Sequence, residues 1–255
     1  MATMTAREAA DRLFKPIQQF TRGWMMAKAT AQRGVELGLP SGHEFWVIGR
    51  AGVLGDCHPE VAAAGLAFIA PGAVREAYEK LPVGLSPLDV AREYGACCTG
   101  WGSTELARFD ADRMERLDAL GRRTIDAAPA SLGAIFAGWR VMPRPADVGG
   151  RVALTTHVLR EMRGAAHIAA VIAAGLSPLD AILASPAPPP RSGPEWAGHM
   201  RWEGPFRDPE EVRGARGAAE EATAAVMATW FGVLDGEELA DFTEIVATTR
   251  DDIDM

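Results

Sequence analysis

Cysteine is scarce in this 255-residue sequence, which contains only Cys57, Cys97 and Cys98. So few cysteines, and an odd number of them, do not make the disulfide framework on which many small secreted proteins depend. No apolar run reaches the ~20 residues that a membrane-spanning helix needs. The first residues show no apolar signal-peptide core either. We therefore expect a cytoplasmic protein that does not enter a membrane.

Positive charge is scarce as well. Lysine and arginine total 26 against 34 acidic residues, which gives a net charge of −8. A protein whose main partner is a nucleic acid needs a clustered positive surface, so no nucleic-acid partner is expected. Hydrophobic residues make up 48% of the sequence, which is enough for a sizeable buried core in a chain of this length.

Sequence motifs for common cofactors are also missing. The glycines at positions 49, 52 and 55 form neither a dinucleotide fingerprint nor a phosphate loop, and we expect them to allow close helix packing instead. No G-x-S-x-G, C-x-x-C or H-E-x-x-H pattern occurs. We therefore predict no cofactor and no metal ligands. Haem or a metal ion held by His157, His167 or His58 remains an alternative.

The composition favours helix, because alanine is abundant and alternating β-branched residues are rare. The predicted fold is all-α, a helical bundle of two packed lobes that span residues 1–140 and 150–255. The irregular stretch 140–150 joins them, and a proline-rich connection at 185–194 is expected to be extended and non-helical. Helical periodicity covers approximately residues 5–20, 58–81, 86–98, 104–128, 151–175, 177–184, 208–231 and 236–248.

Two copies of Gly-Leu-Ser-Pro-Leu-Asp, beginning at Gly84 and Gly175, predict two helix starts. In each copy the serine is placed to cap the helix and the proline to occupy its first turn. The aspartate three residues after the serine lies near the positive end of the helix dipole. Shared capping chemistry explains the repetition as well as an internal duplication does.

The residues with the most chemistry lie between positions 157 and 167, in the stretch HVLREMRGAAH. On a helix His157, Arg160, Gly164 and His167 share one face, and Glu161 lies one turn from His157. A glycine in mid-helix costs about 1 kcal/mol relative to alanine, which makes sense where a ligand or another helix approaches the backbone. The opposite stripe is apolar and is expected to face the core; it comprises Val158, Met162, Ala165, Ala169 and Ile172.

Two interpretations of this face are open. It is either solvated surface with an Arg–Glu network, or the wall of a site that supplies a proton donor, a proton acceptor and an anion clamp. In the second interpretation His157 and His167 exchange protons as catalytic residues, and Glu161 orients an imidazole. The residues expected to bind substrate are Arg160, Arg163, Gly164, Trp46 and Trp139, of which the two tryptophans form part of an apolar wall.

The same stretch resembles an actinobacterial family of helix-turn-helix-like helical proteins of unassigned chemistry. The family signature Arg-Glu-x-Arg-Gly-x-x-His is matched by Arg160, Glu161, Arg163, Gly164 and His167. The resemblance extends from about residue 10 to residue 248, and it implies a helical bundle followed by a winged-helix-like unit. No wing strands are recognisable between Trp202 and Thr229, so the resemblance implies a degenerate unit that has lost its wing.

This sequence keeps the signature from Arg160 to His167 but lacks the wing that would read DNA. That combination favours a site for chemistry on a small molecule. The leading hypothesis is an enzyme of specialised metabolism, such as an isomerase, cyclase or lyase, which acts on a largely apolar metabolite by acid/base chemistry. One alternative is a ligand-responsive transcriptional regulator with a degenerate helix-turn-helix. The other is a haem- or metal-binding helical protein. A small-molecule substrate and a second copy of the chain, in a homodimer, are the expected partners.

Overall fold

The computed structural model of the protein describes residues 3–185 and 192–253. This part of the chain is all-α, as predicted, with no strand. Its α-helices are α1 (Ala6–Met25), α2 (Lys28–Glu36), α3 (Gly42–Ala51), α4 (Pro59–Leu66), α5 (Pro71–Glu79), α6 (Pro87–Glu105), α7 (Ala111–Ala127), α8 (Ala134–Arg140), α9 (Val148–Ala173), α10 (Pro178–Leu183), α11 (Gly193–His199), α12 (Arg213–Phe231) and α13 (Gly236–Asp251). Short 3₁₀ helices are η1 (Gly52–Leu54), η2 (Ala130–Leu132) and η3 (Pro209–Val212).

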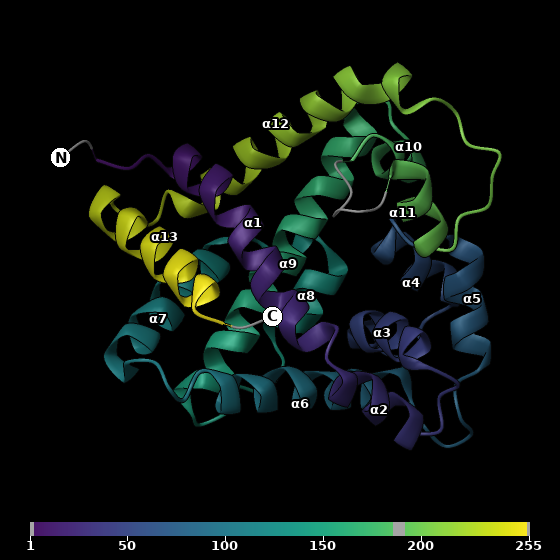
Figure 1. Cartoon of the computed structure of the whole chain (residues 1–255), viewed down its shortest axis with the longest axis horizontal. Coiled ribbons are helices and arrows are strands. Elements are labelled where there is room, and N and C mark those ends of the chain that lie inside the picture. The colour runs from purple at the N-terminus through teal and green to yellow at the C-terminus, as the bar shows by residue number, and fades with distance from the viewer. Residues whose placement is uncertain (1–2, 186–191, 254–255) are drawn as a thin grey trace.

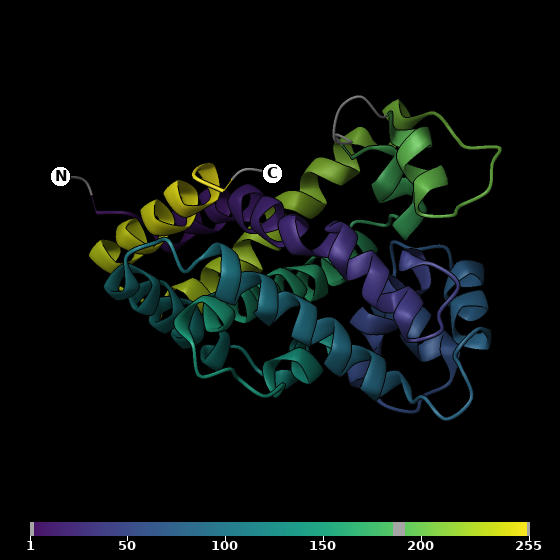
Figure 2. The same cartoon turned by 60° about the horizontal axis from the view of Figure 1, so that its bottom comes forward.

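Helix α9 lies at the centre of the molecule (Figure 1). Asp147 caps it by accepting a hydrogen bond from the amide of Gly150 at 2.7 Å. Helices α1, α6, α7, α8 and α12 pack around it, so its buried residues extend nearly all the way round instead of forming one stripe. The turned view of Figure 2 shows α7 and α13 at one end of the molecule, with α3–α5 and α10–α11 at the other.

Glycine permits the close crossing of α6 and α9. A Cβ atom on Gly102 would overlap the carbonyl oxygen of Gly149, and the reverse holds as well. Similar packing occurs where α3 continues into η1, since a Cβ atom on Gly49 would lie 2.5 Å from the Tyr94 ring, and one on Gly52 would overlap the carbonyl of Pro87. The expectation that these two glycines allow close packing is confirmed. Gly55 differs, because its φ of 74° is a left-handed conformation that favours glycine.

The link between α8 and α9 is anchored by charge. Arg144 donates to both oxygens of Asp118 on α7 at 2.6 Å, and Arg151 at the start of α9 reaches the same carboxylate at 3.3 Å. Asp118 is largely buried and also accepts from Thr155 at 2.5 Å. These ion pairs hold the link against α7 and α9.

The two predicted helix starts are confirmed. Ser86 and Ser177 are the N-caps of α6 and α10, each in a capping box with the aspartate three residues on, and each is followed by proline in the first turn. His58 likewise caps α4, ahead of Pro59. Capping depends on residues adjacent in sequence, so it was readable without the fold.

Helix lengths were less well predicted. The single helix expected over 58–81 is two helices, because Pro71 lacks the amide that a helix interior needs and so begins α5. The segment expected to be non-helical at 185–194 is helical from Gly193, since Pro194 lies in the first turn of α11, where proline is tolerated. Most of that segment, residues 186–191, lies outside the described residues. Helices α2, α3, α8 and α11, of seven to ten residues each, lie outside the predicted helical segments.

The first and last helices pack together. Helix α1 contacts both α12 and α13, and one hydrophobic core cluster contains Leu13 and Phe20 together with Met227 and Phe242. Both predicted lobes contribute to that cluster, and the division into lobes stays a prediction. No wing of strands accompanies α12 and α13 in the described part of the chain.

Candidate functional site

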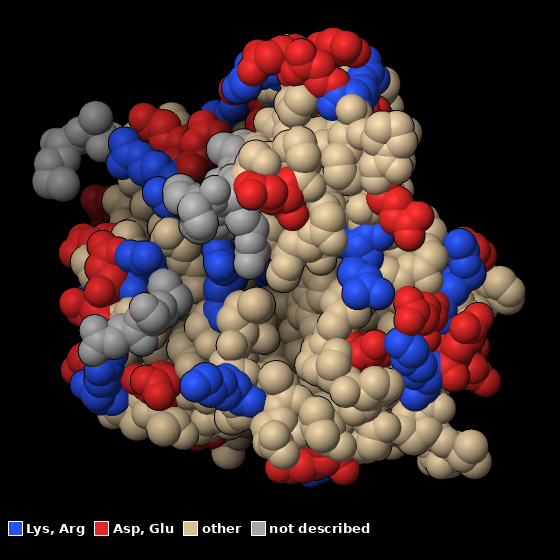
Figure 3. Space-filling model, turned by 45° about the vertical axis from the view of Figure 1, so that its right-hand side comes forward, with Lys and Arg blue, Asp and Glu red and all other residues tan. Residues whose placement is uncertain are grey.

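A pocket of about 940 Å³ lies against the second half of α9. Helices α1 and α3 form much of its wall, and segments of α2, α4, α6, α8, α10, α11 and α12 contribute to it. Figure 3 shows a hollow on this side of the molecule, bordered mostly by uncharged residues. The volume is of the size that holds a small organic ligand. Apolar side chains of the wall include Leu13, Ile17, Leu66, Phe68, Ile168 and Phe231.

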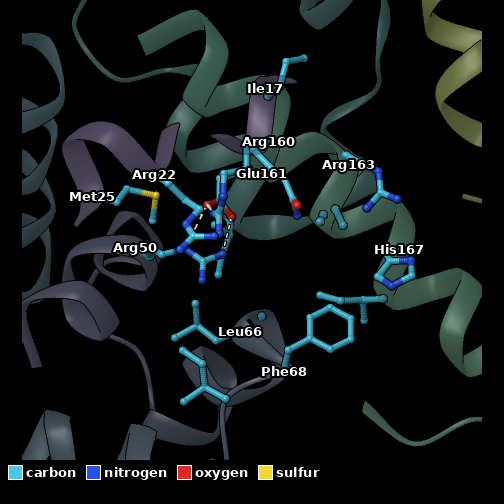
Figure 4. A pocket seen from close by; sticks show the side chains of 18 of the residues that line it. Ile17, Arg22, Met25, Arg50, Leu66, Phe68, Arg160, Glu161, Arg163 and His167 are labelled. Atoms are coloured by element: carbon cyan, nitrogen blue, oxygen red, sulfur yellow. Dashed lines mark hydrogen bonds and ion pairs between the residues drawn. The ribbon is translucent and has the colours of Figure 1, made fainter. Parts of the chain in front are cut away.

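At one side of the pocket, two guanidinium groups share one carboxylate (Figure 4). Arg50 of α3 donates to the two oxygens of Glu161 at 3.0 and 2.9 Å, and Arg160 donates to one of them at 2.6 Å. Glu161 is only 4% exposed. Burial by itself raises the pKa of this carboxyl group, but the two guanidiniums outweigh it and lower the pKa to about 2. The cluster therefore carries one net positive charge.

Arg22 approaches the same cluster from α1 (Figure 4). Its guanidinium has no hydrogen-bond or ion-pair partner among the described side chains. Arg50 also lies over the ring of Trp46, with 5.6 Å between its Cζ atom and the ring centroid. This side of the pocket is therefore cationic, in a protein of net charge −8.

His167 marks the other side of the pocket, where it is 7% exposed and stacks on Phe68 with the ring centroids 5.4 Å apart. Its Nδ1 lies 2.8 Å from the hydroxyl of Thr223, which itself donates to the carbonyl of Ala219 at 2.7 Å. A hydroxyl has one proton to donate. Nδ1 must therefore carry the hydrogen, and Nε2 keeps its lone pair. Burial lowers the pKa of His167 to about 4, so the ring is neutral at pH 7.

Charged groups surround this imidazole. The nearest carboxylate oxygen, on Glu220, lies 4.0 Å from Nε2. Glu220 also pairs with Arg163 at 2.5 Å and with Arg216. Arg163 lies over the ring of Phe14, with 3.2 Å between its Cζ atom and the ring centroid, and burial lowers its pKa to about 10. An imidazolium formed at His167 would therefore face a carboxylate whose charge two arginines already balance.

Of the four residues expected to share one face of α9, Arg160, Gly164 and His167 lie together at the pocket and His157 does not. The first three line the pocket, whereas His157 is fully buried between the rings of Trp24 and Trp139, with ring centroids 5.2 and 4.4 Å away. Neither of its ring nitrogens has a hydrogen-bond partner among the described residues. Glu161 orients two arginines and no imidazole. The buried surface of α9 is therefore wider than the helical periodicity of its apolar residues suggests.

The two tryptophans expected in the wall are also separated. Trp46 lines the pocket, but Trp139 is buried behind it, where its indole nitrogen donates to the carbonyl of Arg50 at 2.9 Å. The opposite apolar stripe is only half correct. Val158 and Met162 are buried, whereas Ile172 lines the pocket and is 63% exposed.

Four residues of the site were not predicted as such: Arg22, Arg50, Thr223 and Glu220. Arg50 lies four residues after Trp46, which was expected in the wall, but it had no signal of its own. The others lie on α1 and α12, far from α9 in sequence. The local sequence around these residues does not connect them with α9. Only the packing of α1 and α12 against α9 brings them to the site.

Two further features of the described residues concern metal ions and membranes. No group of three or more histidine, cysteine, aspartate or glutamate side chains comes together there in a way that could hold a metal ion. Within the same residues, no helix combines the length and the apolar character that crossing a bilayer requires.

These features define an all-helical protein with an internal, ligand-sized pocket that is cationic on one side. The model of a helix-turn-helix family matches residues 7–254, and the chain belongs to that family. The match covers nearly the whole chain, as the resemblance noted from the α9 signature does. No curated protein and no solved structure matches this chain.

Proposed function

We propose that the protein is an enzyme that binds a largely apolar small molecule in this pocket and takes a proton from it at His167. The observation that carries the proposal is the hydrogen-bond arrangement of this residue. Thr223 fixes the hydrogen on Nδ1, and Nε2 keeps its lone pair, with no hydrogen bond to a described residue. A neutral imidazole held in one tautomer is the form that a general base needs.

The surroundings of His167 support the return of the proton as well. When Nε2 accepts a proton, the positive charge forms 4.0 Å from the Glu220 carboxylate, which favours it, and near Arg163 and Arg216, which disfavour it. The low pKa of His167 then makes the imidazolium a ready proton donor. One residue can therefore remove a proton and return it at another atom, as an isomerase or lyase requires. His157 has no part in this proposal, because it does not line the pocket.

Deuterium transfer tests this proposal. We would incubate the protein in D₂O with small molecules extracted from cells and record their masses. The expected result is deuterium in an apolar metabolite with the wild-type protein and none with His167→Gln, which keeps a polar side chain but not the base. Arg33→Met is the control, because Arg33 does not line the pocket and pairs with Glu93 on α6. Equal labelling by wild type and His167→Gln would refute the proposal.

Membership of a helix-turn-helix family favours a second candidate, a ligand-responsive regulator. The charge pattern is less favourable to it. Arginines of α7 and α12 pair with acids, as Arg116 does with Asp241 at 2.9 Å, and positive and negative atoms alternate over the face seen in Figure 3. Under the enzyme proposal, duplex DNA binds weakly and without sequence preference. Nanomolar binding of a defined duplex at physiological salt would favour the regulator.

A further inference from the structure

We infer that Arg22 and the Arg50–Glu161–Arg160 cluster bind the carboxylate of an apolar monocarboxylic acid, which extends along α9 towards His167. The inference rests on the proposed function and gives it a class of ligand. Nothing in the fold itself requires a second arginine at Glu161, because Arg50 already engages both of its oxygens.

The first argument is charge. Two guanidiniums and one carboxylate leave one positive charge in a largely buried place, where an unbalanced charge is costly. Arg160 has five N–H donors, and only one of its nitrogens is hydrogen-bonded within the described residues. Its other donors and the unpaired guanidinium of Arg22 remain available to an anion. One bound monoanion balances the buried charge.

The second argument is shape. The planar fork of a guanidinium matches the two oxygens of a carboxylate, which gives this pair its directional hydrogen bonds. Between this cluster and His167 the wall is mostly apolar, with Leu66 and Phe68 below in Figure 4 and Ile17 above. Uncharged atoms are therefore suited to the middle of the pocket.

The third argument is spacing along α9. Arg160 and His167 are seven residues apart, which on a helix corresponds to roughly 10 Å. Gly164 lies between them on the same face, and a Cβ atom built on it would meet nothing within 4 Å. That space is open to a ligand that spans the distance. The ligand is thus an acid whose apolar body separates the carboxylate from the group that loses a proton.

Calorimetric titration of the whole chain with decanoate, methyl decanoate and decyl phosphate tests the inference. We expect decanoate to bind at least about tenfold more tightly than the uncharged ester, because only the acid forms charge-assisted hydrogen bonds. Arg160→Met and Arg22→Met should each reduce that difference. Arg160→Met leaves the pair of Arg50 and Glu161 intact, and Arg22 is an exposed residue, so both variants should fold. Arg33→Met, outside the pocket, should bind like the wild type.

Three results would overturn the inference: no binding of decanoate, equal binding of decanoate and its ester, or tighter binding of decyl phosphate than of decanoate. The deuterium experiment separates this outcome from the proposed function. Labelling that depends on His167 without any carboxylate preference would leave the enzyme proposal standing and the carboxylate site refuted. Carboxylate binding without labelling would support the carboxylate site and refute the enzyme proposal.

Discussion

His157 and Trp139 pack edge to face, with their ring centroids 4.4 Å apart and their planes at 87°. The imidazole is fully buried, and burial lowers its pKa to about 3, well below the value of a free histidine. His157, which the sequence suggests as a catalytic residue, is therefore a neutral part of the aromatic core. Its titration has a consequence for folding.

Acid should destabilise the protein in a window set by its buried histidines. The pKa is about 3 for His157 and about 4 for His167 in the folded chain, but about 6.5 in the unfolded chain. The unfolded state therefore binds more protons as the pH falls, so stability is complete above about pH 6.5 and decreases below it. Each histidine contributes up to about 1.4 kcal/mol per pH unit. Urea unfolding at a series of pH values measures the slope.

His157→Phe is the variant that identifies the source of this slope. Phenylalanine keeps an aromatic ring beside Trp139 and cannot titrate, so the slope should decrease by up to about 1.4 kcal/mol per pH unit between about pH 6 and pH 4.5. An unchanged slope would show that His157 is not held neutral in the folded protein.

Replacing Thr223 should release the tautomer of His167. Thr223→Val keeps the shape of the side chain but removes the acceptor for Nδ1–H, so we expect a mixture of the two neutral tautomers. The loss of one buried hydrogen bond should cost about 1–3 kcal/mol of stability. ¹⁵N spectra of the histidine rings distinguish the tautomers directly. If the variant kept a single Nδ1–H form, something other than Thr223 would determine it.

Two glycine-to-alanine changes should have opposite effects. At Gly164 the new methyl group enters open space, so the better helix propensity of alanine should raise the stability by up to about 1 kcal/mol. At Gly102 the methyl group would overlap the carbonyl oxygen of Gly149, and pushing α6 from α9 should cost about 1–3 kcal/mol or more. Thermal unfolding of both variants tests the pair. A destabilised Gly164→Ala protein would contradict the open face of α9.

The two arginines on Glu161 should differ in their importance for folding. Arg50→Met removes the bidentate pair that joins α3 to α9, and breaking a buried ion pair costs about 3–5 kcal/mol. Arg160→Met should change the stability by no more than about 1 kcal/mol, because Glu161 keeps Arg50 and the excess charge disappears. Denaturant unfolding of the two variants gives the comparison. Equal losses would mean that both arginines are structural.

Much of the fold was predictable from neighbouring residues. The serine caps of α6 and α10, the proline in the first turn of each, and the helical state of α9 all depend on interactions within a few residues. The break before Pro71 had a visible cause too, and reading 58–81 as one helix overlooked it. A homodimer stays a prediction.

Part of the candidate site was predictable for a similar reason. Helical periodicity fixes the relative directions of Arg160, Gly164 and His167, and all three line the pocket. It does not fix which sides of α9 other helices cover. That is why His157, at the matching position two turns from Gly164, is enclosed by aromatic rings while the later residues face a cavity.

By itself, the sequence determined most of the longer helices, the caps of α6 and α10 and the chemical groups that α9 presents. Only the tertiary structure decided how those groups act. Glu161 has its charge fixed by Arg50, 111 residues away in sequence, and His167 has its tautomer fixed by Thr223, 56 residues away. The partners are remote because burial and hydrogen bonding act over a few ångströms of space, and chain order does not specify which distant helices share that space.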